Sequence, residues 1–209
     1  MTFTTKNSDQ TVKIVQAAAQ LFARQGYHGT STKEIARIAE ISENTVFRHF
    51  AHKEDIFWAA LRSRLEGLRL RRDLMEGIAG GEDLEIVVPQ ILAQLVDTTI
   101  LKPELLRLIA VAHIEFHWKA AMVCYEYLSP IFSAINRYLA ANIENGKMRN
   151  LDTAMVTAAL ATTVIVLPEF SKLLRGSAPP YSDNREAVRA YTKFWLDVLA
   201  PRPSTASSV

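Results

Sequence analysis

The sequence predicts an all-α protein, in which a small N-terminal three-helix domain with a helix-turn-helix precedes a larger helical domain. Apolar residues recur at helical spacing near the N-terminus, at Ile14, Val15, Ala18, Leu21 and Phe22. We find no convincing strand pattern along the 209 residues. We expect the first domain to occupy residues 1–53, the second residues 54–200, and a disordered tail residues 201–209.

The boundaries of the first three helices are predicted by local signals. Gly26 is expected to end the first amphipathic helix. Ser31 followed by Glu34 has the spacing of a capping box, so a short second helix should begin near Thr32. Ser42 is an N-cap candidate for a short third helix with an apolar inner side. This arrangement is typical of a helix that enters the major groove of DNA.

The third helix and the helix ends around it supply the side chains that such binding requires. Residues at helix ends are expected to meet phosphates, and residues on the exposed side of the third helix to read bases. The phosphate candidates are Thr32, Lys33, His49 and Lys53, and the base-reading candidates are Glu43, Asn44, Thr45 and Arg48. Taken singly, each charged residue is better explained as part of a solvated helix surface, whereas together within a helix-turn-helix these residues favour DNA contact. Residues 1–53 contain seven Lys and Arg against four Asp and Glu, which favours the DNA interpretation.

These residues resemble the N-terminal domain of TetR/AcrR-type transcriptional regulators over about fifty residues. The resemblance is carried by Ile14-Val15-Gln16-Ala17-Ala18, Leu21-Phe22, Gly26-Tyr27, Ile35-Ala36, Ser42, Thr45-Val46, His49-Phe50 and Lys53. It implies a homodimeric regulator, usually a repressor of a palindromic DNA operator, with a larger helical domain that dimerises and binds a small-molecule effector. The alternative is a helical protein-interaction module with weakened DNA binding.

Three positions depart from the pattern of that family. Glu40 stands where the turn between the two short helices usually carries glycine, which costs about 1 kcal/mol if the turn needs a positive φ. Asn44 replaces a small residue and could pair with adenine. Phe47 replaces a tyrosine whose hydroxyl commonly reaches a phosphate, so it keeps the ring and loses the donor.

The remainder of the chain is predicted to be helical. We expect a long connecting helix over residues 53–75, a loop at Gly80-Gly81, a helix over residues 83–100, and another that begins at Pro103. Pro130 should start or kink a helix, and Gly146 should end it. The basic stretch of the connecting helix is interpreted as a solvated or ion-paired face.

Two apolar helices, residues 152–174 and 184–199, close the chain. The resemblance implies that they pair across a two-fold axis as a four-helix bundle. The expected interface residues are Val156, Leu160, Val164, Leu167, Tyr191, Phe194, Trp195 and Val198. The alternative is an ordinary core within one chain.

Aromatic residues concentrate between residues 112 and 127, where an apolar or aromatic effector could bind. The candidate residues are His113, Phe116, His117, Trp118, Met122 and Tyr125. The alternative is that these aromatics fill a core. His113 and His117 could in principle share a metal, but Glu115 would face away from them, so no metal or cofactor is expected.

Composition and motifs exclude several other classes. The single cysteine, Cys124, excludes an intrachain disulfide framework and fits a reducing cytoplasm. The N-terminus lacks the order of a secretory signal, and the most apolar run is too short and too polar to span a membrane. No P-loop, nucleophile elbow or H-E-x-x-H motif is present, so no catalytic residue is expected.

Overall fold

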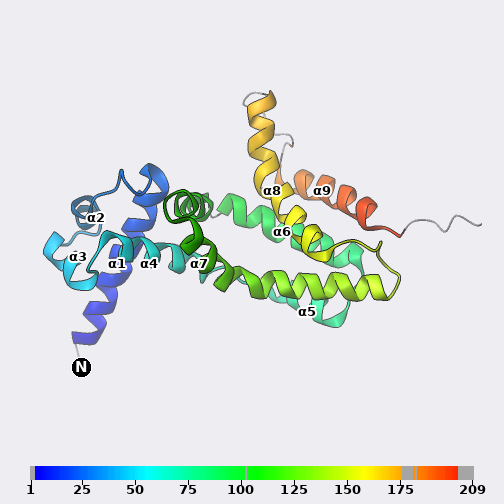
Figure 1. Ribbon diagram of the computed structural model, residues 1–209, viewed down its shortest axis with the longest axis horizontal. Coiled ribbons are helices and arrows are strands. Elements are labelled where there is room, and N and C mark those ends of the chain that lie inside the picture. Colours follow the sequence, from blue (N-terminus) through cyan, green and yellow to red (C-terminus); the bar gives the residue numbers. More distant parts are fainter. Residues whose placement is uncertain (1–2, 102, 176–180, 182, 202–209) are drawn as a thin grey trace, which may run out of the picture. The chain divides into compact units, whose positions relative to one another are not determined.

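The structure is a computed structural model that describes residues 3–101, 103–175, 181 and 183–201. All regular elements in these ranges are α-helices, which confirms the all-α prediction (Figure 1). They are α1 (Phe3–Gln25), α2 (Thr32–Ile38), α3 (Glu43–His49), α4 (Lys53–Leu65), α5 (Arg72–Gly80), α6 (Leu84–Leu101), α7 (Pro103–Glu144), α8 (Thr153–Arg175) and α9 (Asn184–Leu199). No helix in the described ranges is both long and apolar enough to cross a membrane.

The chain forms two compact units. The first comprises residues 1–69 and 102–128, and the second comprises residues 70–101 and 129–209. The expected first domain, residues 1–53, therefore lies within the first unit, whereas residues 54–200 contribute to both. Helix α7 belongs to both units, because its first 26 residues lie in one and its remainder lies in the other.

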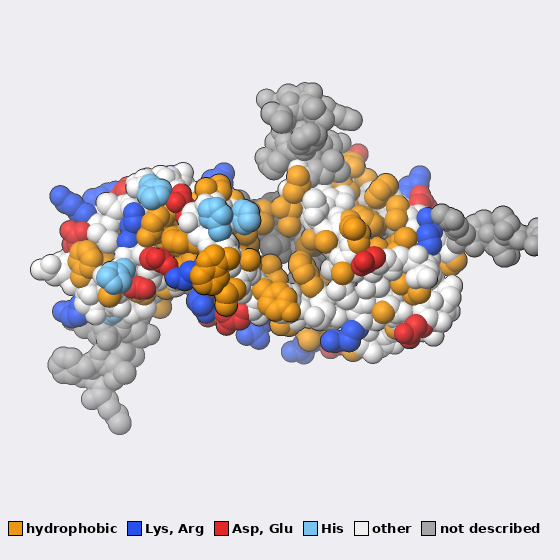
Figure 2. Space-filling view, viewed as in Figure 1, with side chains coloured by type: hydrophobic (Ala, Val, Ile, Leu, Met, Phe, Trp, Pro, Cys, Tyr) orange, Lys and Arg blue, Asp and Glu red, His pale blue; other side chains and the backbone are white. Residues whose placement is uncertain are grey.

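The first unit is built around the contact of α1 with α4 and with α2. Ile14, Phe22, Ile35 and Phe57 are completely buried in its core. The rings of Phe22 and Phe57 meet edge to face, with centroids 5.1 Å apart, a geometry that aromatic pairs prefer. This core leaves polar side chains outside, and Figure 2 shows Lys and Arg side chains at the end of the unit that carries α2 and α3.

The two short helices begin where their caps predict. The Ser31 hydroxyl oxygen accepts a hydrogen bond from the Glu34 amide at 3.1 Å, and the Ser42 hydroxyl oxygen accepts one from the Thr45 amide at 3.1 Å. Each cap satisfies a backbone donor that the helix itself cannot pair. The Glu34 carboxylate accepts a hydrogen bond from the Gln25 side chain at 2.6 Å, which ties α2 to the end of α1.

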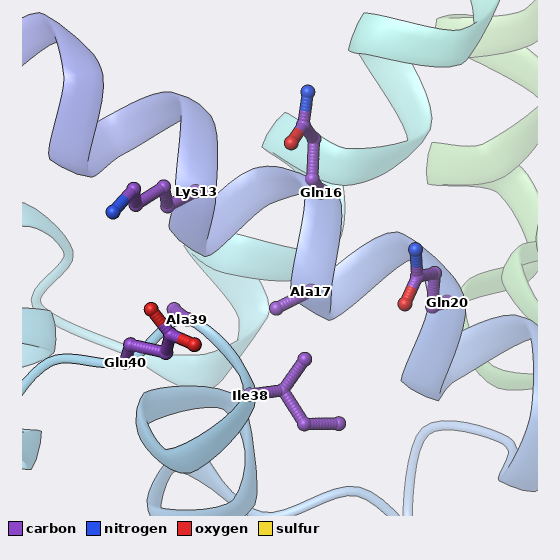
Figure 3. Close-up of a pocket in the computed structure, with 7 residues that line it drawn as sticks. All are labelled: Lys13, Gln16, Ala17, Gln20, Ile38, Ala39 and Glu40. Carbon is purple, nitrogen blue, oxygen red and sulfur yellow. The ribbon is translucent and has the colours of Figure 1, made fainter.

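Glu40 occupies the turn between α2 and α3 with φ of 57°, in the left-handed region. The backbone at Glu40 therefore has a positive φ, which glycine, the usual residue at this position in the family, adopts without strain. The exposed side chain of Glu40 lines a small pocket of about 190 Å³ (Figure 3). The other lining residues include Lys13, Gln16 and Gln20 of α1 and Ile38 of α2.

Replacing Glu40 with glycine is expected to raise the free energy of unfolding by about 1 kcal/mol, because the Cβ clash at positive φ disappears. Urea denaturation measures the change. Glu40→Ala is the matched control, since it removes the carboxylate and keeps the Cβ. Equal stability of the glycine and alanine variants would contradict strain at this turn.

The expected connecting helix over residues 53–75 is wrong in its extent. Helix α4 ends at Leu65, residues 66–71 are not helical, and α5 begins separately at Arg72. The break follows from packing, because Leu68 packs against the first core and Leu70 against the second. Gly67 within the break makes helical continuation less favourable. Gly81 then caps α5 with φ of 67°, so the loop expected at Gly80-Gly81 begins at Gly81, and Gly80 is the last residue of α5.

Helix α7 begins at Pro103 as predicted, but its break is not at Pro130. Pro130 lies in helical backbone, and the non-helical residue is His117, with φ of 42° and ψ of −109°. Phe116, immediately before it, packs among the rings of Tyr27, Phe57 and Trp58. These contacts leave Phe116 partly buried and hold this point of α7 on the first unit, beside a break that the sequence does not signal.

The second unit packs α6 against α5, α8 and α9. Its core contains Val87, Leu92, Leu139, Leu160 and Leu199, all at most 1% exposed. The bounds of α8 and α9 agree with the expected helices over residues 152–174 and 184–199. Most of the turn-rich segment between them, residues 176–180 and 182, lies outside the described residues, as do residues 202–209 of the expected tail.

Candidate nucleic-acid interface

Helix α3 packs against the core of the first unit on one side and is exposed to solvent on the other. Val46 is completely buried, whereas Asn44 and Arg48 are exposed and the Phe47 side chain is 50% exposed. Within the described part of the chain, the side chains of Asn44 and Arg48 have no hydrogen-bond or ion-pair partner. Both are therefore available to a ligand.

Other polar side chains around α3 are engaged in bonds to α2 and within the N-cap of α3. The Thr32 hydroxyl donates to the Glu43 carboxylate at 2.6 Å. The Thr45 and Ser42 hydroxyls lie 2.8 Å apart and share a hydrogen bond. Of the expected contacts, Thr32, Glu43 and Thr45 thus have a first partner within the chain; the first bond holds α3 to α2, and the second holds the N-terminus of α3.

His49 links α3 to α1. Its Nδ1 lies 3.0 Å from the Thr11 hydroxyl, and its Nε2 lies 3.3 Å from the Gln10 carboxamide oxygen. A ring protonated on Nε2 satisfies both contacts, because it donates to Gln10 and accepts from Thr11. The structure therefore gives this expected phosphate ligand an internal contact at each ring nitrogen.

Lys53 is also engaged inside the unit. Its ammonium group donates to the backbone carbonyls of Tyr27 and Thr30, at 3.0 and 3.1 Å, and stands 4.3 Å from the centre of the Tyr27 ring. It thereby fastens the loop between α1 and α2 to the start of α4. The sequence predicts a phosphate contact for Lys53 and does not reveal this internal role, because the partners of the ammonium group are backbone carbonyls more than twenty residues away.

Helices α1 and α2, as well as α3, contribute exposed lysine and arginine side chains. Lys13, Lys33 and Arg37 are exposed, in addition to Arg48 of α3. A phosphate backbone approaching α3 would meet Lys33 at the start of α2. Of the expected phosphate candidates, Lys33 is the one that is exposed and has no partner among the described residues.

Helix α4 connects the helix-turn-helix to the first part of α7 through ion pairs. Glu54 accepts hydrogen bonds from Lys119 and from the Trp58 indole, and these bonds lower the pKa of its carboxyl group. Arg62 pairs with Glu126 and Arg64 with Glu104, each at 3.3 Å. The interpretation of the basic stretch as an ion-paired face is therefore confirmed for Arg62 and Arg64.

The expected effector residues divide between the core of the first unit and the surface. Phe116 is partly buried and packs against the aromatic core of the first unit, which was the alternative. The other five are on the surface, and Trp118, Met122 and Tyr125 are 72%, 63% and 74% exposed; the remaining two are His113 and His117. No group of three potential metal ligands occurs among the described residues.

The expected dimer residues lie mostly in the second core. Val156, Leu160, Val164, Tyr191 and Trp195 are buried there within one chain, as the alternative proposed, and Val198 is partly buried against them. The side chain of Leu167 is outside the described part. Phe194 is 55% exposed. The outer side of α8 instead presents other residues, namely Met155, Ala158, Thr162 and Val166.

Comparison with known proteins identifies the N-terminal segment. Residues 14–60 match the family model of bacterial regulatory proteins, tetR family. The helix-turn-helix-type transcriptional regulator YvkB of Bacillus subtilis is 47% identical over 49 residues, which are 23% of this chain and 26% of that protein. The fatty acid metabolism regulator protein of Bacillus subtilis is 28% identical over 79 residues, which are 37% of this chain and 41% of that protein. These matches span less than half the length of either relative.

Solved structures extend the likeness of fold to almost the whole chain. A regulatory protein of the tetR family from Rhodococcus RHA1 superposes with a TM-score of 0.68 at 17% identity, covering 93% of this chain and 98% of that one. HlyIIR, a hemolysin II transcriptional regulator, gives a TM-score of 0.65 at 17% identity, covering 90% and 97%. With the geometry of α1 to α4, these findings show that residues 14–60 form a DNA-binding segment of the tetR family of bacterial regulatory proteins, and that almost the whole chain shares the fold of solved members of that family.

Proposed function

We propose that this protein is a homodimeric transcriptional repressor that binds a palindromic DNA operator through α3. The observation that carries the proposal is the outer side of α3, where Asn44 and Arg48 are exposed and without partners among the described residues. The neighbouring polar groups hold the helix in place. A rigidly held helix with free side chains at its surface is suited to reading base edges in the major groove.

Each free side chain has a base that fits its chemistry. The Arg48 guanidinium can donate to O6 and N7 of guanine, and the Asn44 carboxamide can pair with N6 and N7 of adenine. The exposed Phe47 ring can contact a thymine methyl group. Glu43 keeps a carboxylate oxygen for a cytosine amine while Thr32 holds the other. Lys33 is the proposed phosphate ligand.

The proposed dimer forms through the outer sides of α8 and α9. Met155, Ala158, Thr162 and Val166 repeat at helical spacing along α8, and Met155 and Val166 are 69% and 50% exposed. Phe194 of α9 is exposed as well. Two recognition helices held about 34–36 Å apart, or a multiple of that distance, would then read two half-sites.

Replacing both Met155 and Val166 with glutamate is expected to convert the dimer into a monomer and to abolish operator binding, because like charges would face each other in an apolar contact. Sedimentation velocity measures the mass, and fluorescence anisotropy measures binding. Ile86→Glu, a matched change at a 48% exposed apolar residue of α6, should leave both unchanged. A dimer that persists in the double variant would contradict the proposed interface.

The proposed effector releases the operator by binding more tightly to a conformation in which the two recognition helices no longer match their half-sites. Equal affinity for both conformations would shift nothing. Helix α7 can transmit the change, since it runs from the second unit into the first, where ion pairs fasten it to α4.

The alternative of an interaction module is separated from a regulator by one experiment. The purified chain is mixed with sheared genomic DNA of its source organism at two salt concentrations, and the bound fragments are sequenced. A repressor should recover a few discrete regions, with total binding that falls steeply as salt rises. Recovery of DNA without enrichment of any region would contradict the proposal and favour the interaction module.

A further inference from the structure

The second unit contains a cleft that the functional proposals above do not use. It lies between α5, with the two glycines at its end, and the last part of α7, and its volume is about 510 Å³. This volume is within the range of sites for small organic ligands. On the α7 side it is lined by Ala134, Tyr138 and Ala141, which follow one face of the helix. On the α5 side, Leu70, Met75 and Ile78 complete an apolar wall.

The polar part of the cleft includes two cationic side chains. Arg137 and Lys147 line it, and no aspartate or glutamate is among its lining residues in the described part of the chain. Lys147 is paired with Asp83 at 2.6 Å. The guanidinium of Arg137 has neither an ion-pair nor a hydrogen-bond partner among the described residues. Arg137 is therefore the cation of the cleft that can receive an anionic group.

Tyr138 adds no negative charge to this wall. Its hydroxyl donates to the Glu82 carbonyl at 2.7 Å, and burial raises the pKa of the hydroxyl to about 12. The ring is 4% exposed and is held in place by that bond. An apolar surface with one free guanidinium beside it complements a molecule that is apolar along most of its length and carries a single carboxylate.

We propose that this cleft binds an amphipathic monocarboxylate, with its apolar chain against Met75, Ile78 and Ala141 and its carboxylate on Arg137. Arginine suits this group because its planar fork of donors matches a carboxylate with two parallel hydrogen bonds. That this ligand is the effector rests on the proposed function. Its binding to the cleft is measured without DNA and is therefore tested separately.

The probe is sodium decanoate, titrated into the full chain in a calorimeter, with 1-decanol as the uncharged comparison. Decanoate should saturate one site per chain. Arg137→Gln should weaken decanoate by about tenfold, the effect of a lost charge-assisted hydrogen bond, and leave 1-decanol unchanged. Arg189→Gln, at an exposed arginine of α9 outside the cleft, should bind like the wild type.

A second variant tests the apolar part. Ala141 is exposed on the cleft wall, so the larger ring of Ala141→Phe should occupy the cleft, leave the helical circular dichroism spectrum intact, and weaken decanoate at least tenfold. Unsaturable binding, or equal affinity in the wild type, Arg137→Gln and Ala141→Phe, would overturn the assignment. Such a failure would leave the proposed DNA binding untouched, because no DNA is present.

Discussion

Replacing Arg48 with alanine is expected to cost about 1–3 kcal/mol of binding free energy per half-site and to relax base preference at one position in each. The reason is that the Arg48 guanidinium is exposed on α3 without a partner among the described residues, so its donors are free to meet a base. Anisotropy titrations at fixed salt, with operator duplexes that vary one base pair at a time, measure both effects.

Lys33→Ala is the comparison for Arg48. Because Lys33 is proposed to contact a phosphate, its loss should weaken all duplexes alike and reduce the dependence of log K on log salt by about one unit per contact. If Arg48→Ala instead weakened every duplex by the same factor and changed no base preference, Arg48 would not read a base.

Replacing Lys53 with methionine is expected to lower the free energy of unfolding by about 2 kcal/mol, although the change keeps most of the apolar stem. The backbone carbonyls of Tyr27 and Thr30, which accept hydrogen bonds from Lys53, would lose a charged donor, and the Tyr27 ring would lose its cation–π contact. Urea denaturation gives the stability, and the salt dependence of operator binding should stay as in the wild type.

Lys33→Met is the matched control, because it makes the same change at an exposed lysine of α2 and should alter stability by less than about 0.5 kcal/mol. Unchanged stability of Lys53→Met together with a reduced salt dependence would show that Lys53 contacts phosphate, as the sequence alone indicates.

The sequence predicts the starts of α2 and α3, but neither the end of α4 nor the break in α7. Ser31 and Ser42 cap their helices through bonds that reach only three residues, so local sequence carries the information. The end of α4 depends instead on Leu68 and Leu70 packing against different cores, and the break in α7 lies beside Phe116, which packs against the first core. Neither cause is visible in a local pattern.

The difference between local signals and distant contacts also explains which roles of the site residues the sequence predicts. Helical spacing groups Val156 with Leu160 and Tyr191 with Trp195, but it cannot say whether the partner is another helix of the same chain or a second chain. Here the partner is the chain's own core. The side chains around α3 were predicted as a set, whereas the internal bonds of His49 and Lys53 depend on contacts with α1 and its following loop.

Selection of duplexes from a random pool tests the central claim most directly. The purified protein is mixed with the pool at near-physiological salt, and the recovered sequences are compared over several rounds. A sequence-specific dimer should enrich one palindromic motif, with half-sites separated by a whole number of helical turns. A pool that shows no enrichment, although the protein is folded, would contradict sequence-specific DNA recognition by α3.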